Sequence, residues 1–212
     1  MKITDDHLIA NELMDVNTII FDAYWTLLTP STLKVRELLK DFSKEKQWEI
    51  YELLKKSQDF DEVIEIIPFQ SKQKKEEFIG KVKRDVKEIL PFDESISILD
   101  FLKDKYQLII DSNLIPPYDE PIRNNFSKLV DDTILSFQEQ YPKWEKKHYE
   151  LLKKRLGKKG EEILFVGDSI RNDYEFPKRS KMNALHLQRS GKTHIESIET
   201  LEELLSLLKI KP

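Results

Sequence analysis

The segment Ile163-Leu164-Phe165-Val166-Gly167-Asp168-Ser169-Ile170-Arg171-Asn172-Asp173 decides the fold. It begins with four apolar residues, which suit a strand buried on both faces of a sheet, and it continues into a turn with two acids. Four more runs of this kind lie along the chain: Thr18–Phe21, Leu108–Ile110, Thr133–Leu135 and Ala184–Leu187. Apolar residues at helical spacing, as in 96–102 and 149–156, lie between the runs. This alternation predicts an α/β fold with a doubly wound, Rossmann-like parallel sheet.

Residues 30–90 break this rhythm because they contain helical patterns only. We expect helices there over Leu33–Phe42, Trp48–Leu54, Val63–Ile67 and Phe78–Leu90, and a terminal amphipathic helix over Ile195–Ile210. Pro30 and Pro91 mark the edges of the helical stretch. The sequence therefore predicts an α/β core domain of residues 1–29 and 91–212 and an inserted all-helical cap domain of residues 30–90.

The composition excludes several kinds of site. The chain has 212 residues with five glycines and no cysteine, and its 35 Lys and Arg face 39 Asp and Glu. No glycines have the spacing of GxGxxG or GxxxxGK phosphate loops, and without cysteine there are no disulfides or cysteine-ligated metals. A net charge of −4 predicts no nucleic-acid partner, and no apolar run is long enough to predict a membrane partner. We expect a cytoplasmic protein that is a monomer or a homodimer.

The residues that can carry chemistry follow the predicted strands directly. In a parallel sheet the carboxyl ends of the strands meet at one edge, and binding sites collect there. Asp22, Ser112, Asn113 and Asp168 stand at such ends, and Asp173 follows five residues after Asp168. An aspartate in this place can act as a nucleophile that forms a covalent intermediate. Two carboxylates about 4 Å apart repel by roughly 4 kcal/mol at an effective dielectric of 20, so three of them call for a cation.

Four segments resemble, in order and spacing, the signature motifs of the haloacid dehalogenase-like (HAD) hydrolase superfamily. They are Ile19–Leu27, Ile110–Asn113, Pro142-Lys143 and Val166–Asp173. The resemblance covers nearly the whole chain, and the GDSxxND pattern of the last segment is its most specific part. It implies a HAD-type core with a cap that selects the substrate.

The phosphatases of this family attack phosphorus with an aspartate, and Asp22 takes that position here. The resemblance implies that Ser112 hydrogen-bonds a phosphoryl oxygen and that Lys143 offsets negative charge on the nucleophile and the phosphoryl group. We assign Ser112, Asn113 and Trp25 to substrate binding. The implied reaction is hydrolysis of a small phosphorylated metabolite through an aspartyl-phosphate intermediate.

The implied cofactor is Mg²⁺. The resemblance assigns it to Asp22, Asp168, Asp173 and the backbone carbonyl of Tyr24. Oxygen ligands in octahedral geometry suit this ion, which usually keeps several waters as well.

Two positions depart from the phosphatase pattern. Tyr24 stands where phosphatases carry the general acid and base, an aspartate, and Trp25 stands where the family has glycine. L-2-haloacid dehalogenases carry tyrosine at the first position, use no metal and have neutral residues in place of Asp168. One alternative is therefore a 2-haloacid dehalogenase-type hydrolase, for which Arg36 and Arg84 are the cap candidates to receive halide. The other is a catalytically impaired HAD-like binding protein.

Both departures have physical consequences. The phenol of Tyr24 is a poor base at neutral pH but could donate to a leaving oxygen, so we list it as a candidate catalytic residue. Loss of a general acid costs about 10²- to 10⁴-fold in rate, which favours acyl or aryl phosphates with good leaving groups. Trp25 cannot take positive φ cheaply, so either the turn differs or the indole closes over the pocket. Gln140 and Lys181 also stand where the family usually shows glycine.

Overall fold

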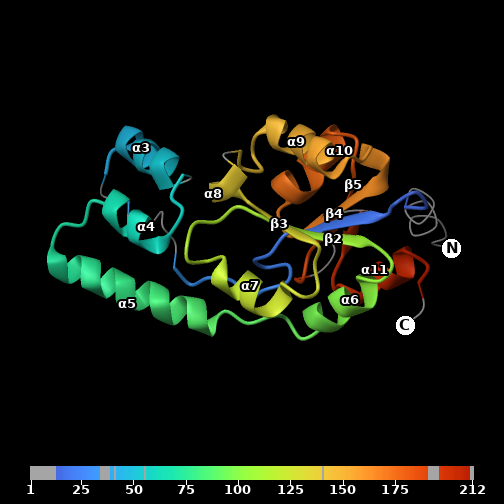
Figure 1. The fold of residues 1–212 in the computed structure, drawn as a ribbon, viewed down its shortest axis with the longest axis horizontal. Coiled ribbons are helices and arrows are strands. Elements are labelled where there is room, and N and C mark those ends of the chain that lie inside the picture. The colour runs from blue at the N-terminus through green and yellow to red at the C-terminus, as the bar shows by residue number, and fades with distance from the viewer. Residues whose placement is uncertain are drawn as a thin grey trace.

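The computed structural model describes residues 13–33, 39–40, 42–54, 56–139, 141–190 and 196–210. These residues form a six-stranded parallel sheet in the order β3-β2-β1-β4-β5-β6 (Figure 1). The strands are β1 Thr18–Phe21, β2 Gln107–Ser112, β3 Asp132–Leu135, β4 Ile163–Gly167, β5 Asn183–Leu187 and β6 Ser197–Ile198. This order belongs to doubly wound sheets, so the predicted fold class is confirmed.

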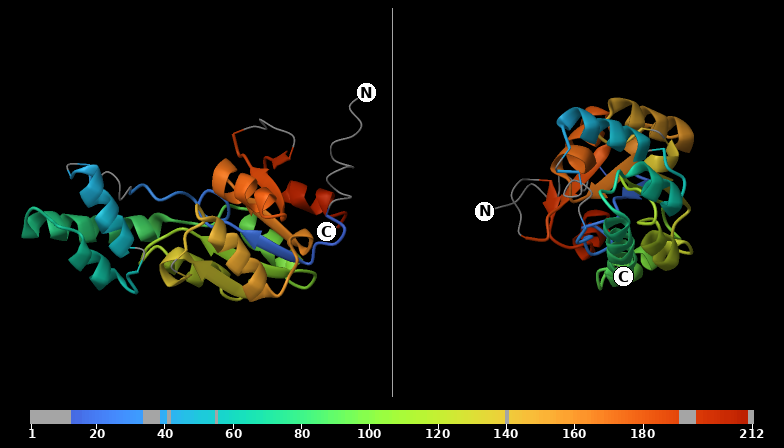
Figure 2. Two further views of the ribbon diagram at one scale, coloured as in Figure 1. Left: turned by 90° about the horizontal axis from the view of Figure 1, so that it is seen from above. Right: turned by 90° about the vertical axis from the view of Figure 1, so that its left-hand side faces the viewer.

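Helices cover both faces of the sheet (Figures 1 and 2). One face carries α6 Ser95–Leu102, α7 Glu120–Phe126 and α11 Glu202–Leu207, and the other carries α9 Lys146–Leu156 and α10 Phe176–Arg179. Alternate strand residues feed the two cores: Ile19 and Phe21 pack with α6 and α7, whereas Ile20 packs with Tyr149 of α9. Full burial of such a side chain contributes about 1.5–3 kcal/mol, which explains why the strand runs are apolar throughout.

Between β1 and α6 the chain forms a helical insertion that projects beyond one end of the sheet (Figures 1 and 2). It consists of α3 Lys44–Leu54, α4 Phe60–Ile66 and α5 Lys72–Glu88. Asp59 and Ser71 cap α4 and α5 by accepting backbone N–H bonds with their side chains. Helix α5 begins six residues before the expected Phe78, because its polar first turns carry no apolar signal. The expected helix over 33–42 lies mostly outside the described residues, and the domain boundaries at 30 and 90 stay a prediction.

The prediction of one continuous helix over Ile195–Ile210 is wrong. Ser197 and Ile198 form strand β6, which pairs with His186 and Leu187 of β5, and α11 covers only 202–207. A strand of two residues is too short to show alternation, so its apolar residue merged with the helical pattern that follows. In the described part of the chain, no helix is long and apolar enough to cross a membrane.

Candidate active site

The register of the central strands brings the predicted residues to one edge of the sheet. Phe21 of β1 lies opposite both Ile110 of β2 and Val166 of β4, so Asp22 and Ser112 emerge close to the end of β4. The backbone N–H of Asp22 donates to the carbonyl of Val166 at 2.9 Å, which continues the ladder one residue past the strand. The site therefore forms where the sequence places it, at the carboxyl ends of three adjacent strands.

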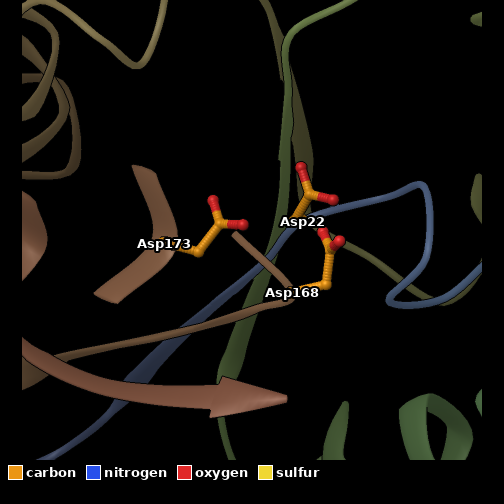
Figure 3. A group of neighbouring side chains, drawn as sticks. All are labelled: Asp22, Asp168 and Asp173. Carbon is orange, nitrogen blue, oxygen red and sulfur yellow. The ribbon is translucent and has the colours of Figure 1, made fainter. Parts of the chain in front are cut away.

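Three carboxylates converge at this edge (Figure 3). Asp22, Asp168 and Asp173 each offer an oxygen, and the three oxygens lie within 4.8 Å of one another. Asp173 belongs to the π-helical turn η2 Ile170–Glu175, and its Oδ2 accepts the N–H of Ser169 at 2.9 Å. Gly167 makes room for it, because a Cβ at residue 167 would lie 2.4 Å from that oxygen. The glycine of the fourth motif is thus required by the acid that follows it.

Lys143 is the cation of the cluster. Its side chain is only 2% exposed, and Nζ donates to Asp22 Oδ1 at 2.5 Å and to Asp173 Oδ1 at 2.9 Å. Burial by itself would lower the pKa of Lys143, but Asp173 and Asp22 outweigh burial and raise the pKa above its usual value. The ammonium is therefore retained, and one positive charge faces three carboxylates.

Burial and neighbouring charges both act on the pKa values of the carboxyl groups. Burial raises the pKa of Asp22 well above its usual range, and the charges of Asp173 and Asp168 add to this effect against Lys143. Burial, followed by the charge of Asp173, raises the pKa of Asp168 to about 6. In the free protein the charged forms of Asp22 and Asp168 are therefore disfavoured, and a nearby cation would favour them again.

Three side chains hold the loop that carries Lys143. Asn113 Oδ1 accepts a hydrogen bond from the backbone N–H of Lys143 at 3.0 Å. The hydroxyl of Tyr149 donates to the carbonyl of Lys143 at 2.8 Å. His148 Nδ1 lies 2.7 Å from the carbonyl of Tyr141, and its Nε2 lies 2.7 Å from Asp111 Oδ2. Sequence reasoning gave His148 no role. The sequence feature that could have drawn attention to His148 is its partner Asp111, which stands beside Ser112 at the end of a strand.

Tyr24 directs its hydroxyl away from the carboxylates. It donates to the carbonyl of Tyr118 at 2.6 Å, and the two rings meet edge to face with centroids 6.3 Å apart. Burial raises the pKa of Tyr24 above its ordinary value. Tyr118 in turn donates to Asp85 of α5 at 2.9 Å, and Asp85 also accepts bonds from Ser31 and Thr32. We call Asp85 with Ser31, Thr32 and Tyr118 the hinge cluster, because it joins the helical insertion to the core.

Trp25 adopts the left-handed conformation of the glycine that it replaces. Its φ is 65°, and its side chain is 54% exposed and lines the cavity beside Asp22. Lys181, another residue at a position where glycine was expected, has φ 63°. Each such residue costs roughly 1–2 kcal/mol, and Arg189 stabilises the first turn by donating to the carbonyls of Trp25 and Thr26. Trp25 and Lys181 thus adopt the backbone conformation that favours glycine, and Gln140 lies outside the described residues.

A cavity of about 490 Å³ opens over the carboxylates, between the sheet edge and α3. All the candidate site residues named from the sequence line it: Asp22, Tyr24, Trp25, Ser112, Asn113, Lys143, Asp168 and Asp173. Of the two arginines considered as halide receptors, Arg84 is exposed on α5 and does not line the cavity, and Arg36 lies outside the described part. The predicted set therefore meets at one place, without an arginine from the described residues.

The family model of the haloacid dehalogenase-like hydrolases matches residues 16–180. The chain therefore belongs to this family of hydrolases. No curated protein matches the sequence.

Solved structures agree in fold over almost the full chain. A HAD phosphatase from Thermococcus onnurineus is 22% identical with a TM-score of 0.63, and the match covers 91% of this chain and 98% of that one. A 2-haloacid dehalogenase from Pseudomonas syringae is 15% identical with a TM-score of 0.64, covering 92% and 98%. A putative HAD hydrolase from Bacillus subtilis bound to magnesium is 16% identical with a TM-score of 0.65, covering 92% and 99%. Because these relatives include both activities, the reaction has to be argued from the site.

Proposed function

We propose that this hydrolase is a Mg²⁺-dependent phosphatase that acts on a small phosphorylated substrate through an aspartyl-phosphate on Asp22. The observation that carries the proposal is the convergence of carboxylate oxygens of Asp22, Asp168 and Asp173 within 4.8 Å of one another, with Lys143 bonded to Asp22 and Asp173. Dehalogenases of the family have neutral residues in place of Asp168, so the third acid favours the phosphatase reaction.

The donor set fits magnesium. All three groups offer carboxylate oxygens, the ligands that this hard ion prefers, and two of them are buried. Burial, with the charges of the neighbouring carboxylates, raises the pKa values of Asp22 and Asp168, and a bound cation would offset this effect. We propose the backbone carbonyl of Tyr24 as a fourth ligand. When bound, the ion supplies positive charge against the transferring phosphoryl group.

The residues of the chain then divide the reaction between them. A carboxylate oxygen of Asp22 attacks phosphorus, and the bond to the leaving oxygen breaks with its electron pair. Lys143 holds Asp22 in place and offsets the charge of the phosphoryl group, while the hydroxyl of Ser112 donates to a phosphoryl oxygen. Water next hydrolyses the acyl phosphate, which releases inorganic phosphate and restores the carboxylate of Asp22.

The position at which phosphatases of the family carry a proton donor for the leaving oxygen is occupied here by Tyr24. The hydroxyl of Tyr24 already donates to Tyr118, and burial raises its pKa, so we propose that Tyr24 positions the hinge and gives no proton. Leaving groups must then depart largely unprotonated. We expect the rate to fall steeply as the pKa of the leaving group rises, and a flat dependence would contradict this role for Tyr24.

An activity panel tests the proposal. It consists of 4-nitrophenyl phosphate, acetyl phosphate and 2-chloropropionate, each with and without Mg²⁺, and Asp22→Asn is the control. We expect phosphate release that needs Mg²⁺ and disappears in the variant. Phosphate release that survives Asp22→Asn would overturn the mechanism, and absence of Mg²⁺ binding by calorimetry would overturn the metal site.

The dehalogenase alternative is favoured by Tyr24, which the first motif shares with L-2-haloacid dehalogenases. It requires halide release from 2-chloropropionate without Mg²⁺, which the same panel measures. The alternative of an impaired binding protein is favoured by Trp25 in its left-handed conformation. This binding-protein alternative requires that the chain binds phosphate and turns over no compound of the panel.

A further inference from the structure

The cavity above the carboxylates has a charged end and an apolar end. The charged end is formed by Asp22, Asp168, Asp173 and Lys143 at the edge of the sheet. The apolar end is walled by residues of α3, of the segment after β2 and of the Lys143 loop: Tyr51, Leu54, Leu114, Ile115 and Trp144. A bound ester whose phosphate lies at Asp22 therefore extends its leaving group along the apolar wall.

The aromatic part of this wall begins directly beside the phosphate end. Trp144 follows Lys143 in sequence, and its ring meets that of Tyr51 with centroids 6.4 Å apart and a 59° tilt. Trp25 lines the cavity from the turn after Asp22 and leaves 54% of its side chain exposed. Aromatic rings offer large flat surfaces to a ring of the ligand, in offset or edge-to-face contact. The wall is thus suited to a planar apolar group close to the phosphate.

The described residues of the wall offer no counter-charge to a second negative charge on the substrate. Among the described residues that line the cavity, Lys143 is the one cation, and both Asp22 and Asp173 engage it. A carboxylate or a second phosphate on the leaving group would lose water here without gaining a counter-charge, which is unfavourable. The volume of about 490 Å³ lies within the range of pockets that bind ring-containing small molecules.

The hydrogen bond between Tyr24 and Tyr118 separately favours an aromatic leaving group. Because Tyr24 is bonded to Tyr118, the leaving oxygen has to depart without a strong proton donor. An aromatic alcohol, with a pKa of about 10, leaves under these conditions far more readily than an alkyl alcohol.

We infer that the substrate is a phosphate monoester of an uncharged aromatic alcohol, whose ring contacts Trp144 and Tyr51. This inference rests on the proposed phosphatase function and adds the class of the leaving group to it.

The first experiment measures binding without turnover. Phenylphosphonate and methylphosphonate, which carry the same head group and are not phosphate esters, are titrated into the full chain with Mg²⁺ by calorimetry. We expect phenylphosphonate to bind about tenfold tighter or more, because only this ligand reaches the aromatic wall. Equal affinities would overturn the inference.

The second experiment measures kcat/KM for matched esters. In 4-(methoxycarbonyl)phenyl phosphate the substituent on the ring is uncharged. In 4-carboxyphenyl phosphate the carboxylate on the ring adds a negative charge to that of the phosphate. We expect the neutral ester to be preferred about tenfold or more once rates are corrected for leaving-group pKa. Hydrolysis of both at equal efficiency would overturn the inference that the leaving group is uncharged and leave the phosphatase proposal standing.

Substituting Trp144 tests whether the aromatic wall causes the preference for an aromatic leaving group. Trp144→Ala should reduce the preference for 1-naphthyl phosphate over acetyl phosphate about tenfold, whereas Trp48→Ala should leave it unchanged. Trp48 is the matched control, because it lies on α3 as Tyr51 does but is 61% exposed and does not line the cavity. An unchanged preference in Trp144→Ala would overturn the inference. Selective binding of phenylphosphonate by a chain that hydrolyses no ester would instead overturn the phosphatase function while upholding the ligand class.

Discussion

Asp22 and Asp85 are both buried carboxylates, with 8% and 5% of their surface exposed, but their surroundings differ. Asp85 accepts bonds from the hydroxyls of Ser31, Thr32 and Tyr118 and from the N–H of Thr32. Burial acts to raise the pKa of Asp85, yet these donors together hold it below its usual value. Burial raises the pKa of Asp22, and its two carboxylate neighbours add to this effect against its one side-chain donor, Lys143.

The two carboxylates differ in how their burial is compensated. Four donors satisfy Asp85, and these bonds join the helical insertion to the core. Asp22 is buried beside two other carboxylates with Lys143 as its side-chain donor, and a bound cation would favour its charged form. A site that violates the rule of compensated burial is where function is expected.

Replacing the two aspartates should therefore have different effects, and the largest expected difference is in activity. Asp22→Asn should reduce kcat for 4-nitrophenyl phosphate with Mg²⁺ by about 10⁴-fold or more, because the amide cannot attack phosphorus. Asp85→Asn should reduce kcat far less, since Asp85 does not line the cavity. Steady-state kinetics on both variants measure this contrast, and similar losses in the two would remove the distinction.

The next largest effect is on stability. Asp85→Ala leaves three hydroxyls and one N–H of the hinge without their acceptor, and loss of one member of such a buried set costs about 3–5 kcal/mol. Denaturant unfolding with Mg²⁺ absent measures the free energy of unfolding. Asp104→Ala, at an exposed aspartate, is the matched control and should keep the wild-type midpoint. A midpoint for Asp85→Ala equal to that of the control would show that the hinge cluster contributes nothing.

The sequence was sufficient to predict the sheet and the placement of Asp22 and Asp168 at one edge of it. Strands such as 163–167 are apolar on both faces, and parallel strands bring their carboxyl ends together, so Asp22 and Asp168 could be placed without coordinates. Asp85 could not be found in this way. It is one of many charged residues on α5, and its donors Ser31 and Tyr118 lie 54 and 33 residues away. Local periodicity holds no information on contacts at that separation.

Trp25 shows a different limit of sequence reasoning. A bulky residue at a glycine position predicted either a changed turn or an indole over the pocket, and only the coordinates show that φ stays positive. The turn is retained because other bonds fix it, including Trp25 N–H to the Leu28 carbonyl at 2.8 Å and the two bonds from Arg189. Tertiary contacts have overridden local propensity here.

Gly167→Ala should disturb the cluster of Asp22, Asp168 and Asp173 and so reduce its affinity for Mg²⁺. The added Cβ would lie 2.4 Å from Asp173 Oδ2, so the carboxylate has to move. Displacing one ligand should reduce Mg²⁺ affinity about 10- to 100-fold in a calorimetric titration. Gly80→Ala is the matched control, since its Cβ would meet only Arg84, at 3.5 Å, and should leave the affinity unchanged. Unaltered Mg²⁺ binding in Gly167→Ala would place the metal away from Asp173.

The smallest effect concerns Asp111, a buried carboxylate that is intermediate between Asp22 and Asp85 because its partner, His148, can titrate. His148 Nδ1 faces the carbonyl of Tyr141, which can only accept, so this nitrogen carries hydrogen and Nε2 faces the carboxylate of Asp111. Burial and the nearby Lys143 oppose a charged ring, but Asp111 and the carbonyl outweigh them and raise the pKa of His148. The charged imidazole is therefore favoured in the folded protein.

A raised pKa of a histidine stabilises the fold below its unfolded value of about 6.5, and the contribution is lost as pH rises through the folded value. We expect the free energy of unfolding to fall between pH 6 and 9 by about 1 kcal/mol more in wild type than in His148→Gln, which cannot titrate there. Asp22 and Asp168, whose raised pKa values also make stability fall with rising pH, are present in both proteins, so the difference isolates His148. Parallel pH profiles for the two proteins would show that the imidazole of His148 stays neutral in the folded protein.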